Sequence, residues 1–424
     1  MASRPDSFGE TGLPRGVSGA ADPHFASVAR LFGALFPGRR MGGGALSVYV
    51  QGQPVVDIWT GWADRRGTRR WTADTAPMAF SATKGVASTV IHRLVDRGLL
   101  SYDVPVAEYW PAFGVNGKAA ITLRDIMRHS AGLSHLRGLT RAEMLDHERM
   151  EHRLAAARVD GFAGRSAYHA LTYGWLVAAV ARSVTGSGMR ELIRTELAAP
   201  LGVDGLHLGR PPAAAPTTAA EILLPQRAGA NRIFDTVAPR VAAIRLSKMF
   251  AALYVPGIRS ALQGDAEFLD AEIPSANGVL TARGLARMYG AIANGGSVDG
   301  VRLLSPERVR ELSSGRRSYR PDGNVGVPMN FHLGYHGSPL PGVLPGFGHA
   351  GMGGSIGWAD PGTGSSFAFV HNRLVTPMVF DQSTFLGMAL LLRRAVAGVR
   401  RNGVRPIHHF GSPYAQTADD QRSG

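Results

Sequence analysis

The sequence contains no cysteine among its 424 residues. This absence excludes disulfide bonds, a cysteine nucleophile and thiolate metal sites, and it leaves the cellular compartment open. Lysine is nearly absent as well, because only three of the 46 basic residues are lysines, Lys84, Lys118 and Lys248. A chain that otherwise carries its positive charge on arginine therefore uses lysine at few and noteworthy positions.

Long apolar runs are also missing. No stretch reaches the roughly 18 apolar residues of a membrane-spanning helix. Residues 385–399 come closest, but Arg393 and Arg394 interrupt them. Residues 1–21 are polar and lack the apolar core of a secretory signal. We therefore expect no membrane span and a cytoplasmic location.

Motifs for metals, nucleotides and nucleic acids are absent too. The sequence has no H-E-x-x-H, no Walker loop and no dinucleotide fingerprint, and the pair His408–His409 is interpreted as solvated. The net charge is +14, but the arginines are scattered in short clusters without a nucleic-acid motif. We expect no metal, no cofactor and no nucleic-acid partner, while the oligomeric state stays open.

What the sequence does contain is an S-x-x-K element at Ser81–Lys84. An apolar segment, 76–80, leads into it, and helical spacing follows over 84–98. Residues at i and i+3 share a helix face, so the lysine amine can approach the serine hydroxyl. A lysine in a dry site can remove the hydroxyl proton, whereas arginine stays protonated. A helix cap beside a solvated lysine is the structural alternative.

Strand patterns occur near both ends of the chain. Residues 45–50 and 54–59 have the pattern of one hairpin, and residues 355–359 and 365–370 have the pattern of a second. The patterns between and beside them predict helices at 25–36, 84–98, 104–110, 122–129, 142–157, 169–185, 189–198, 240–262, 281–294, 306–312 and 383–399.

This order predicts one α/β domain built from 23–80 and 340–402. A mostly helical domain, 81–339, interrupts it and includes a lid-like segment at about 205–275. Residues 1–22 are expected to form a disordered tail and 403–424 a loose one. Ser81 then lies at the junction of the two domains, where clefts tend to form.

Across residues 25–400 the chain resembles the serine β-lactamase/penicillin-binding superfamily, most closely its class C β-lactamase-like branch, which includes the family VIII carboxylesterases. Ser81–Lys84 matches the first signature of that superfamily. Residues 168–170 align with Tyr-x-Asn and residues 349–351 with Lys-Thr-Gly. The resemblance implies an α/β (α+β) β-lactamase-like fold, in which helices flank an antiparallel sheet and a mostly helical domain is inserted.

The same resemblance implies roles for individual residues. Ser81 would be the nucleophile, and Lys84 and Tyr168 would share the proton transfer, Tyr168 acting as a phenolate base and then as an acid. The backbone N–H groups of Ser81 and Met352 would stabilise the oxyanion, beside the small residue Gly351. The structural alternatives are ordinary packing for Tyr168 and a glycine-rich edge strand.

Two further residues, His349 and Trp358, are candidate substrate contacts. His349 would bind or polarise substrate, or only hydrogen-bond locally, and Trp358 would line an acyl pocket. Ala170 replaces the asparagine of the second signature and His349 the lysine of the third. Both departures favour an ester over a β-lactam.

A second serine motif contains Ser355. Residues 353–357 fit G-x-S-x-G, the nucleophile elbow of α/β-hydrolases, which requires a helix after the serine. A turn at 360–362 follows instead, so Ser355 is predicted not to be a nucleophile.

We therefore predict a serine carboxylesterase or lipase-like hydrolase that acts on a small-molecule ester or lipid-like substrate through an acyl-enzyme on Ser81. A β-lactamase or D-Ala-D-Ala peptidase on the same fold is the first alternative. A non-catalytic penicillin-binding-like scaffold is the second. Acyl length and alcohol preference stay open.

Overall fold

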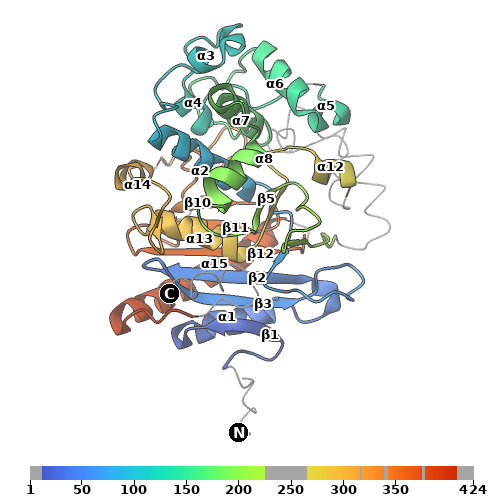
Figure 1. Cartoon of the computed structure of the whole chain (residues 1–424), viewed down its shortest axis with the longest axis vertical. Helices are drawn as coiled ribbons and strands as arrows, with labels where there is room; N and C mark the ends of the chain where they lie inside the picture. The colour runs from blue at the N-terminus through green and yellow to red at the C-terminus, as the bar shows by residue number, and fades with distance from the viewer. Residues whose placement is uncertain are drawn as a thin grey trace.

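A computed structural model describes residues 12–136, 138–224, 265–315, 318–338, 342–374 and 378–407, with the backbone alone at residues 40 and 378–386. Figure 1 shows three zones along the long axis of the molecule. Most of the helices gather at one end, a sheet crosses the middle, and helices from the two chain ends cover the far side of the sheet.

The sheet has six antiparallel strands in the order β1-β3-β2-β12-β11-β10. These strands are β1 (Val17–Ala21), β2 (Gly43–Val50), β3 (Gln53–Gly61), β10 (Phe347–Ala350), β11 (Ile356–Asp360) and β12 (Ser365–His371). Strand β2 from the first hairpin pairs with β12 from the second, in a register that joins Val50 to Ser365. The antiparallel sheet and both predicted hairpins are therefore confirmed.

The predicted disordered tail at 1–22 is wrong for the residues of β1. This strand pairs with β3 from Val17 opposite Thr60 to Ala21 opposite Val56. Its sequence, VSGAA, carries no alternating pattern, and its order comes from backbone hydrogen bonds to a strand about 40 residues away. Residues 1–11 lie outside the described part of the chain.

Helices from both chain ends cover one face of the sheet. Helices α1 (Ala26–Ala34) and α15 (Met378–Asn402) enclose an apolar cluster with the sheet, to which Phe32, Trp358 and Phe369 belong. Helix α13 (Ala282–Ala293) packs on the opposite face. It lies within the segment predicted as the helical domain, yet it is part of the layered sheet structure.

The remaining helices form the inserted region. They are α2 (Ala82–Asp96), α3 (Val106–Tyr109), α4 (Leu123–Met127), α5 (Arg141–Leu145), α6 (His147–Ala156), α7 (Thr172–Thr185), α8 (Met189–Leu192), a π-helical segment (Ile193–Ala198), α12 (Ala266–Asp270) and α14 (Pro306–Ser313). Thr122 and Asp125 form a capping box at the start of α4. The single helix predicted over 142–157 is two, because the Asp146 side chain caps α6 and ends the helical run of α5.

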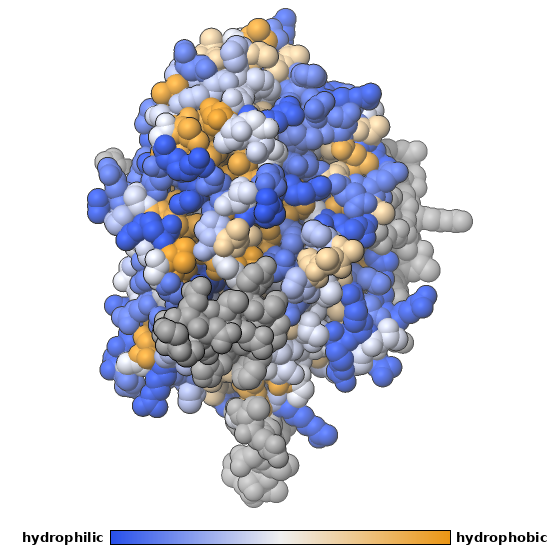
Figure 2. Space-filling view, in the orientation of Figure 1, coloured by the Kyte–Doolittle hydropathy of each residue, from blue (hydrophilic) through white to orange (hydrophobic). Residues whose placement is uncertain are grey.

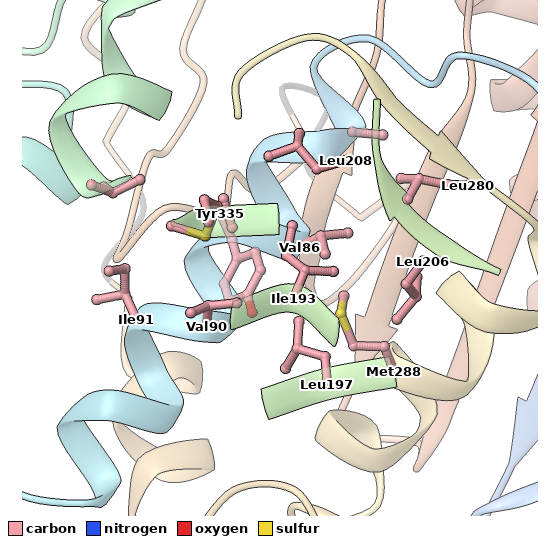
Figure 3. Close-up of a cluster of buried hydrophobic side chains, with 14 of the residues drawn as sticks. Val86, Val90, Ile91, Ile193, Leu197, Leu206, Leu208, Leu280, Met288 and Tyr335 are labelled. Atoms are coloured by element: carbon pink, nitrogen blue, oxygen red, sulfur yellow. The ribbon is translucent and has the colours of Figure 1, made fainter. Parts of the chain in front are cut away.

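Helix α2 is buried along most of its length, and Figure 3 shows the apolar cluster that holds it. Val86 lies beside Ile193 of the π-helical segment and near Met288 of α13, and Val90 and Ile91 belong to the same cluster. Each such buried aliphatic side chain contributes about 1.5–3 kcal/mol relative to exposure. The helix that begins directly after Ser81 is therefore rigidly placed between the two parts of the fold.

The segment predicted as a lid is partly structured. Strand β5 (Leu206–Leu208) pairs with β7 (Gly278–Leu280), and β6 (Thr218–Ala219) pairs in parallel with β4 (Thr75–Ala76). Two short strands, β8 (Ser297–Val298) and β9 (Val301–Arg302), form a hairpin elsewhere. The helix predicted at 240–262 lies outside the described residues, as does most of the lid.

The predicted loose tail starts as coil at residues 403–407, where the Ile407 N–H donates to the Pro54 carbonyl at 2.9 Å. His408 and His409 lie outside the described residues. The face in Figure 2 is mostly hydrophilic, with small scattered apolar patches. Among the helices described, none combines the length and apolar character needed to cross a bilayer.

Candidate active site

Ser81 lies at a sharp turn that leads from a buried segment into α2. The preceding residue, Phe80, has φ +48°, a left-handed conformation that a bulky side chain adopts at a cost of about 1–3 kcal/mol. The Phe80 carbonyl accepts hydrogen bonds from the Thr83 N–H at 2.9 Å and the Thr83 hydroxyl at 2.5 Å. The Thr83 hydroxyl in turn accepts from the Gly278 N–H at 2.9 Å. The strained turn is thus fixed from both sides.

Lys84 lies one turn along α2 and is fully buried. Its Nζ is 3.1 Å from Ser81 Oγ and 2.9 Å from the Ser275 carbonyl oxygen. No ion pair joins it to a carboxylate among the described residues. Burial without a counter-charge lowers the pKa of Lys84 well below its ordinary 10.5. The geometry therefore favours a neutral amine against the serine hydroxyl.

The Ser275 carbonyl is a contact that sequence reasoning missed. The Ser275 hydroxyl accepts from the Gly174 N–H at 2.7 Å, and this fixes residue 275 against the start of α7. The side-chain amide of Asn277 holds the loop, donating to the Phe268 and Ala271 carbonyls at 2.9 and 2.8 Å. A backbone acceptor supplied 191 residues after Lys84 leaves no sequence pattern.

Tyr168 reaches the same place from a third segment. It lies in the loop before α7, its side chain is buried, and the Ser81 side chain is near enough to act on its pKa. Lys84 Nζ is 5.1 Å from the centre of its ring. Burial raises the pKa of Tyr168 above its ordinary 10, against a smaller lowering by the Ser81 side chain. The structure therefore brings Ser81, Lys84 and Tyr168 together and favours a protonated phenol.

The end of β10 approaches the turn at Ser81 closely. A Cβ placed on Gly351 would lie 2.1 Å from the Ala79 carbonyl oxygen and 3.3 Å from the Ala82 nitrogen. Within the described part of the chain, neither the Ser81 N–H nor the Met352 N–H donates to another protein group. Two backbone donors are thus available on segments held against each other.

Gly351→Ala is expected to push these two segments apart. The methyl would contact the Ala79 backbone carbonyl, which has no freedom to rotate away. We expect kcat/KM for a p-nitrophenyl ester to fall by roughly 10²-fold, the size of losing one oxyanion donor. The control is Gly387→Ala on α15, where a Cβ would meet nothing within 4 Å. Equal activity of the two variants would contradict this account of Gly351.

His349 is buried on β10 next to Gly351. Its Nδ1 is 2.9 Å from the Ala350 carbonyl oxygen, and its Nε2 has no hydrogen-bond partner among the described residues. Burial, followed by repulsion from His336 and Lys84, holds the pKa of His349 well below 6.5. A neutral ring that donates from Nδ1 presents Nε2 as an acceptor.

Trp358 belongs to the core of the sheet rather than to the segments around Ser81. It is on β11 in the cluster between the sheet and α1 and α15, and its Nε1 donates to the Pro345 carbonyl at 2.7 Å. Its ring contacts that of His336 at 5.6 Å, and the His336 ring contacts His349 at 4.9 Å. His336 also lines a cavity of about 380 Å³, and Ser81, Lys84 and Tyr168 are not among the residues that line this cavity. Trp358 therefore reaches the serine site only through other side chains.

Ser355 has no nucleophile elbow around it. The strand β11 follows it, rather than a helix, and its side chain is buried. Among the described residues, its hydroxyl makes two long hydrogen bonds of 3.3–3.4 Å, both to the backbone of His371. The prediction that G-x-S-x-G is not an elbow here is confirmed by this local structure.

The chain is similar to a protein family and to several known proteins. The family model described as Beta-lactamase matches residues 28–388. The esterase/beta-lactamase LipL of Mycobacterium tuberculosis (strain ATCC 25618 / H37Rv) is 61% identical over 403 residues, which cover 95% of this chain and 94% of LipL. A family VIII carboxylesterase structure is 30% identical with a TM-score of 0.75, covering 89% of this chain and 99% of its own. The structure of a penicillin-binding protein homologue from Caulobacter crescentus is 30% identical with a TM-score of 0.76, and it covers 89% of this chain and 99% of its own.

Proposed function

Because the chain belongs to the beta-lactamase family, we propose that it is a serine carboxylesterase with Ser81 as the nucleophile and Lys84 as the base. Its fold is that of esterase/beta-lactamase-type serine hydrolases. The observation that carries the proposal is the 3.1 Å contact between Ser81 Oγ and a fully buried Lys84 amine. A desolvated neutral amine at hydrogen-bond distance is what activates a serine hydroxyl.

In the first step the Lys84 amine removes the Ser81 proton while Oγ attacks the ester carbonyl. The N–H groups of Ser81 and Met352 donate hydrogen bonds that stabilise the negative charge developing on the carbonyl oxygen. The sequence suggested Tyr168 as a phenolate base. Its burial instead favours the neutral phenol, so we give Tyr168 the role of acid.

In the second step the carbon–oxygen bond to the alcohol breaks. Tyr168 donates its proton to the leaving oxygen and regains one from the Lys84 ammonium, which leaves an acyl group on Ser81. Water then attacks the acyl carbonyl, its proton passes to Lys84, and Ser81 recovers its proton when the acid departs. Each group ends in its starting protonation state, as a catalytic cycle requires.

The ester preference is supported by what His349 and Ala170 lack. A neutral His349 that presents a lone pair attracts no substrate carboxylate, unlike the lysine at this place in the third signature. Ala170 has no amide to contact a lactam side chain, and its small side chain is buried. The relative LipL carries both activities in its name, so a weaker β-lactamase reaction is the second candidate.

A fluorophosphonate trap tests this proposal. The reagent is expected to add one phosphonyl group, and peptide mass spectrometry is expected to find it on Ser81. In parallel, kcat/KM for p-nitrophenyl butyrate is expected to exceed kcat/KM for a chromogenic cephalosporin by at least about 10²-fold. The reason is that positions 170 and 349 offer no amide and no cation to contact a β-lactam. An unlabelled protein would favour a non-catalytic scaffold, and a preference for the cephalosporin would favour a β-lactamase.

A further inference from the structure

Tyr168 depends on tertiary contacts for its position because it precedes α7 and belongs to no helix or strand. Asp322 Oδ1 accepts from the Tyr168 N–H at 3.0 Å, and Asn324 Nδ2 donates to the Tyr168 carbonyl at 3.0 Å. The Phe331 ring stacks on the phenol with an interplanar angle of 3° and a centroid separation of 5.3 Å. These contacts hold the residue itself and leave its two neighbours to be held elsewhere.

His129 holds both neighbours. Its carbonyl oxygen accepts from the Ala167 N–H at 2.9 Å, and its ring Nδ1 accepts from the His169 N–H at 3.1 Å. The same ring contacts the Tyr168 ring at 5.0 Å and Phe331 at 4.3 Å. One residue therefore accepts hydrogen bonds from the N–H groups of both neighbours of Tyr168 and also packs against its phenol.

The backbone conformation of His129 has an unfavourable free energy by itself. Its φ is +58°, in the left-handed region, directly after the end of α4, and the residue is fully buried. A non-glycine residue pays about 1–2 kcal/mol for this conformation. The two hydrogen bonds and the ring contacts compensate for that cost, and the conformation is what points carbonyl and ring at residues 167 and 169 together.

His129 is unsuited to proton transfer itself. Since Nδ1 accepts a backbone hydrogen bond, the proton of the neutral ring is on Nε2. Burial, and then repulsion from His169, Lys84, His349 and His336, keeps the pKa of His129 well below 6.5. No group of metal-ligating side chains suited to an ion occurs in the described residues. Its contribution is therefore geometric.

We propose that His129 is a positioning residue for Tyr168, acting through the acceptor at Nδ1 that fixes the peptide of residue 169. This inference rests on the proposed role of Tyr168 as the acid for the leaving alcohol. Displacing a general acid by a fraction of an ångström removes much of its effect, which for proton transfer is about 10²–10⁴-fold.

The test compares His129→Phe with His129→Asn. Phenylalanine keeps a ring against Tyr168 and Phe331 but has no acceptor. Asparagine places Oδ1 near the position of Nδ1 and tolerates a positive φ. Each variant is assayed on p-nitrophenyl butyrate, whose alcohol leaves without a proton, and on ethyl butyrate, whose alcohol needs one.

We expect His129→Phe to lower kcat on ethyl butyrate by about 10–100-fold, with KM changed less than about threefold and the nitrophenyl ester less affected. His129→Asn is expected to stay within about fivefold on both esters. Equal losses on both esters, or an asparagine variant as impaired as phenylalanine, would overturn the proposal. If His129→Phe does not fold, His129→Gln replaces it, because its longer side chain misplaces the acceptor and has the same expected outcome.

Tyr168→Phe distinguishes failure of the proposed acid role of Tyr168 from failure of the positioning role of His129. It is expected to reproduce the selective loss on ethyl butyrate. A Tyr168→Phe enzyme without that selectivity removes the proposed acid itself. A selective Tyr168→Phe enzyme beside an unselective His129→Phe enzyme overturns only the role of His129.

Discussion

Ser81→Ala is expected to abolish ester hydrolysis, with kcat falling by roughly 10³–10⁶-fold. Removing the nucleophile of a serine hydrolase costs about this much, and the remainder comes from binding and the oxyanion donors. The fold should be unchanged, because Ser81 makes no side-chain cap for α2 and, among the described residues, its hydroxyl bonds to Lys84 of the site itself. Initial rates on p-nitrophenyl butyrate, with circular dichroism for folding, measure both.

Ser355→Ala is the matched control. It removes a buried hydroxyl whose hydrogen bonds to His371 are long, so about 1 kcal/mol of stability is at stake. We expect its activity to remain within about threefold of the parent and fluorophosphonate labelling to persist. Loss of activity in Ser355→Ala, with Ser81→Ala unaffected, would identify Ser355 as the nucleophile and reject the proposed site.

Lys84→Met carries the second large effect. Methionine resembles the lysine stem in size and is apolar, so it suits a fully buried position but offers no lone pair for the Ser81 proton. We expect kcat/KM to fall by at least about 10³-fold. Lys84→Arg should fall as far, because a guanidinium stays protonated at any working pH. Substantial activity in either variant would place the base elsewhere.

The pH dependence follows from the same amine. Lys84 must be neutral to act, and its pKa lies well below 10.5, so kcat/KM should rise with pH and level off well below pH 10.5. The raised pKa of Tyr168 predicts no loss through phenol ionisation on that plateau. The acid limb belongs to the Lys84–Tyr168 pair. If Lys84 is the base, the acid limb of the kcat/KM profile should persist in Tyr168→Phe. If the acid limb disappears in that variant, the titrating group is Tyr168.

Burial of Lys84 also predicts a stability signature. A base whose pKa is lowered on folding binds fewer protons in the folded state, so its stability contribution rises with pH up to the unfolded value of 10.5. Lys84→Met removes this linkage. The Tm of Lys84→Met should exceed the Tm of the parent by the largest amount at low pH. This difference in Tm should shrink as the pH approaches 10.5.

The sequence by itself determined the local chemistry. Helical spacing puts Ser81 and Lys84 on one face of α2, and the Nζ–Oγ distance of 3.1 Å in the structure agrees with that geometry. Hairpin patterns predicted β2, β3, β11 and β12, and the missing helix after Ser355 excluded an elbow. These features depend on residues a few positions apart, which is the range over which backbone periodicity acts.

Only the tertiary structure decided the rest. The lowered pKa of Lys84 comes from burial by residues throughout the chain, and its second partner is a carbonyl at Ser275. The contacts that hold Tyr168 come from His129, Asp322 and Asn324, across separations of 39 to 156 residues. Burial and long-range backbone hydrogen bonds depend on how distant segments pack, and packing leaves no periodic pattern in the sequence.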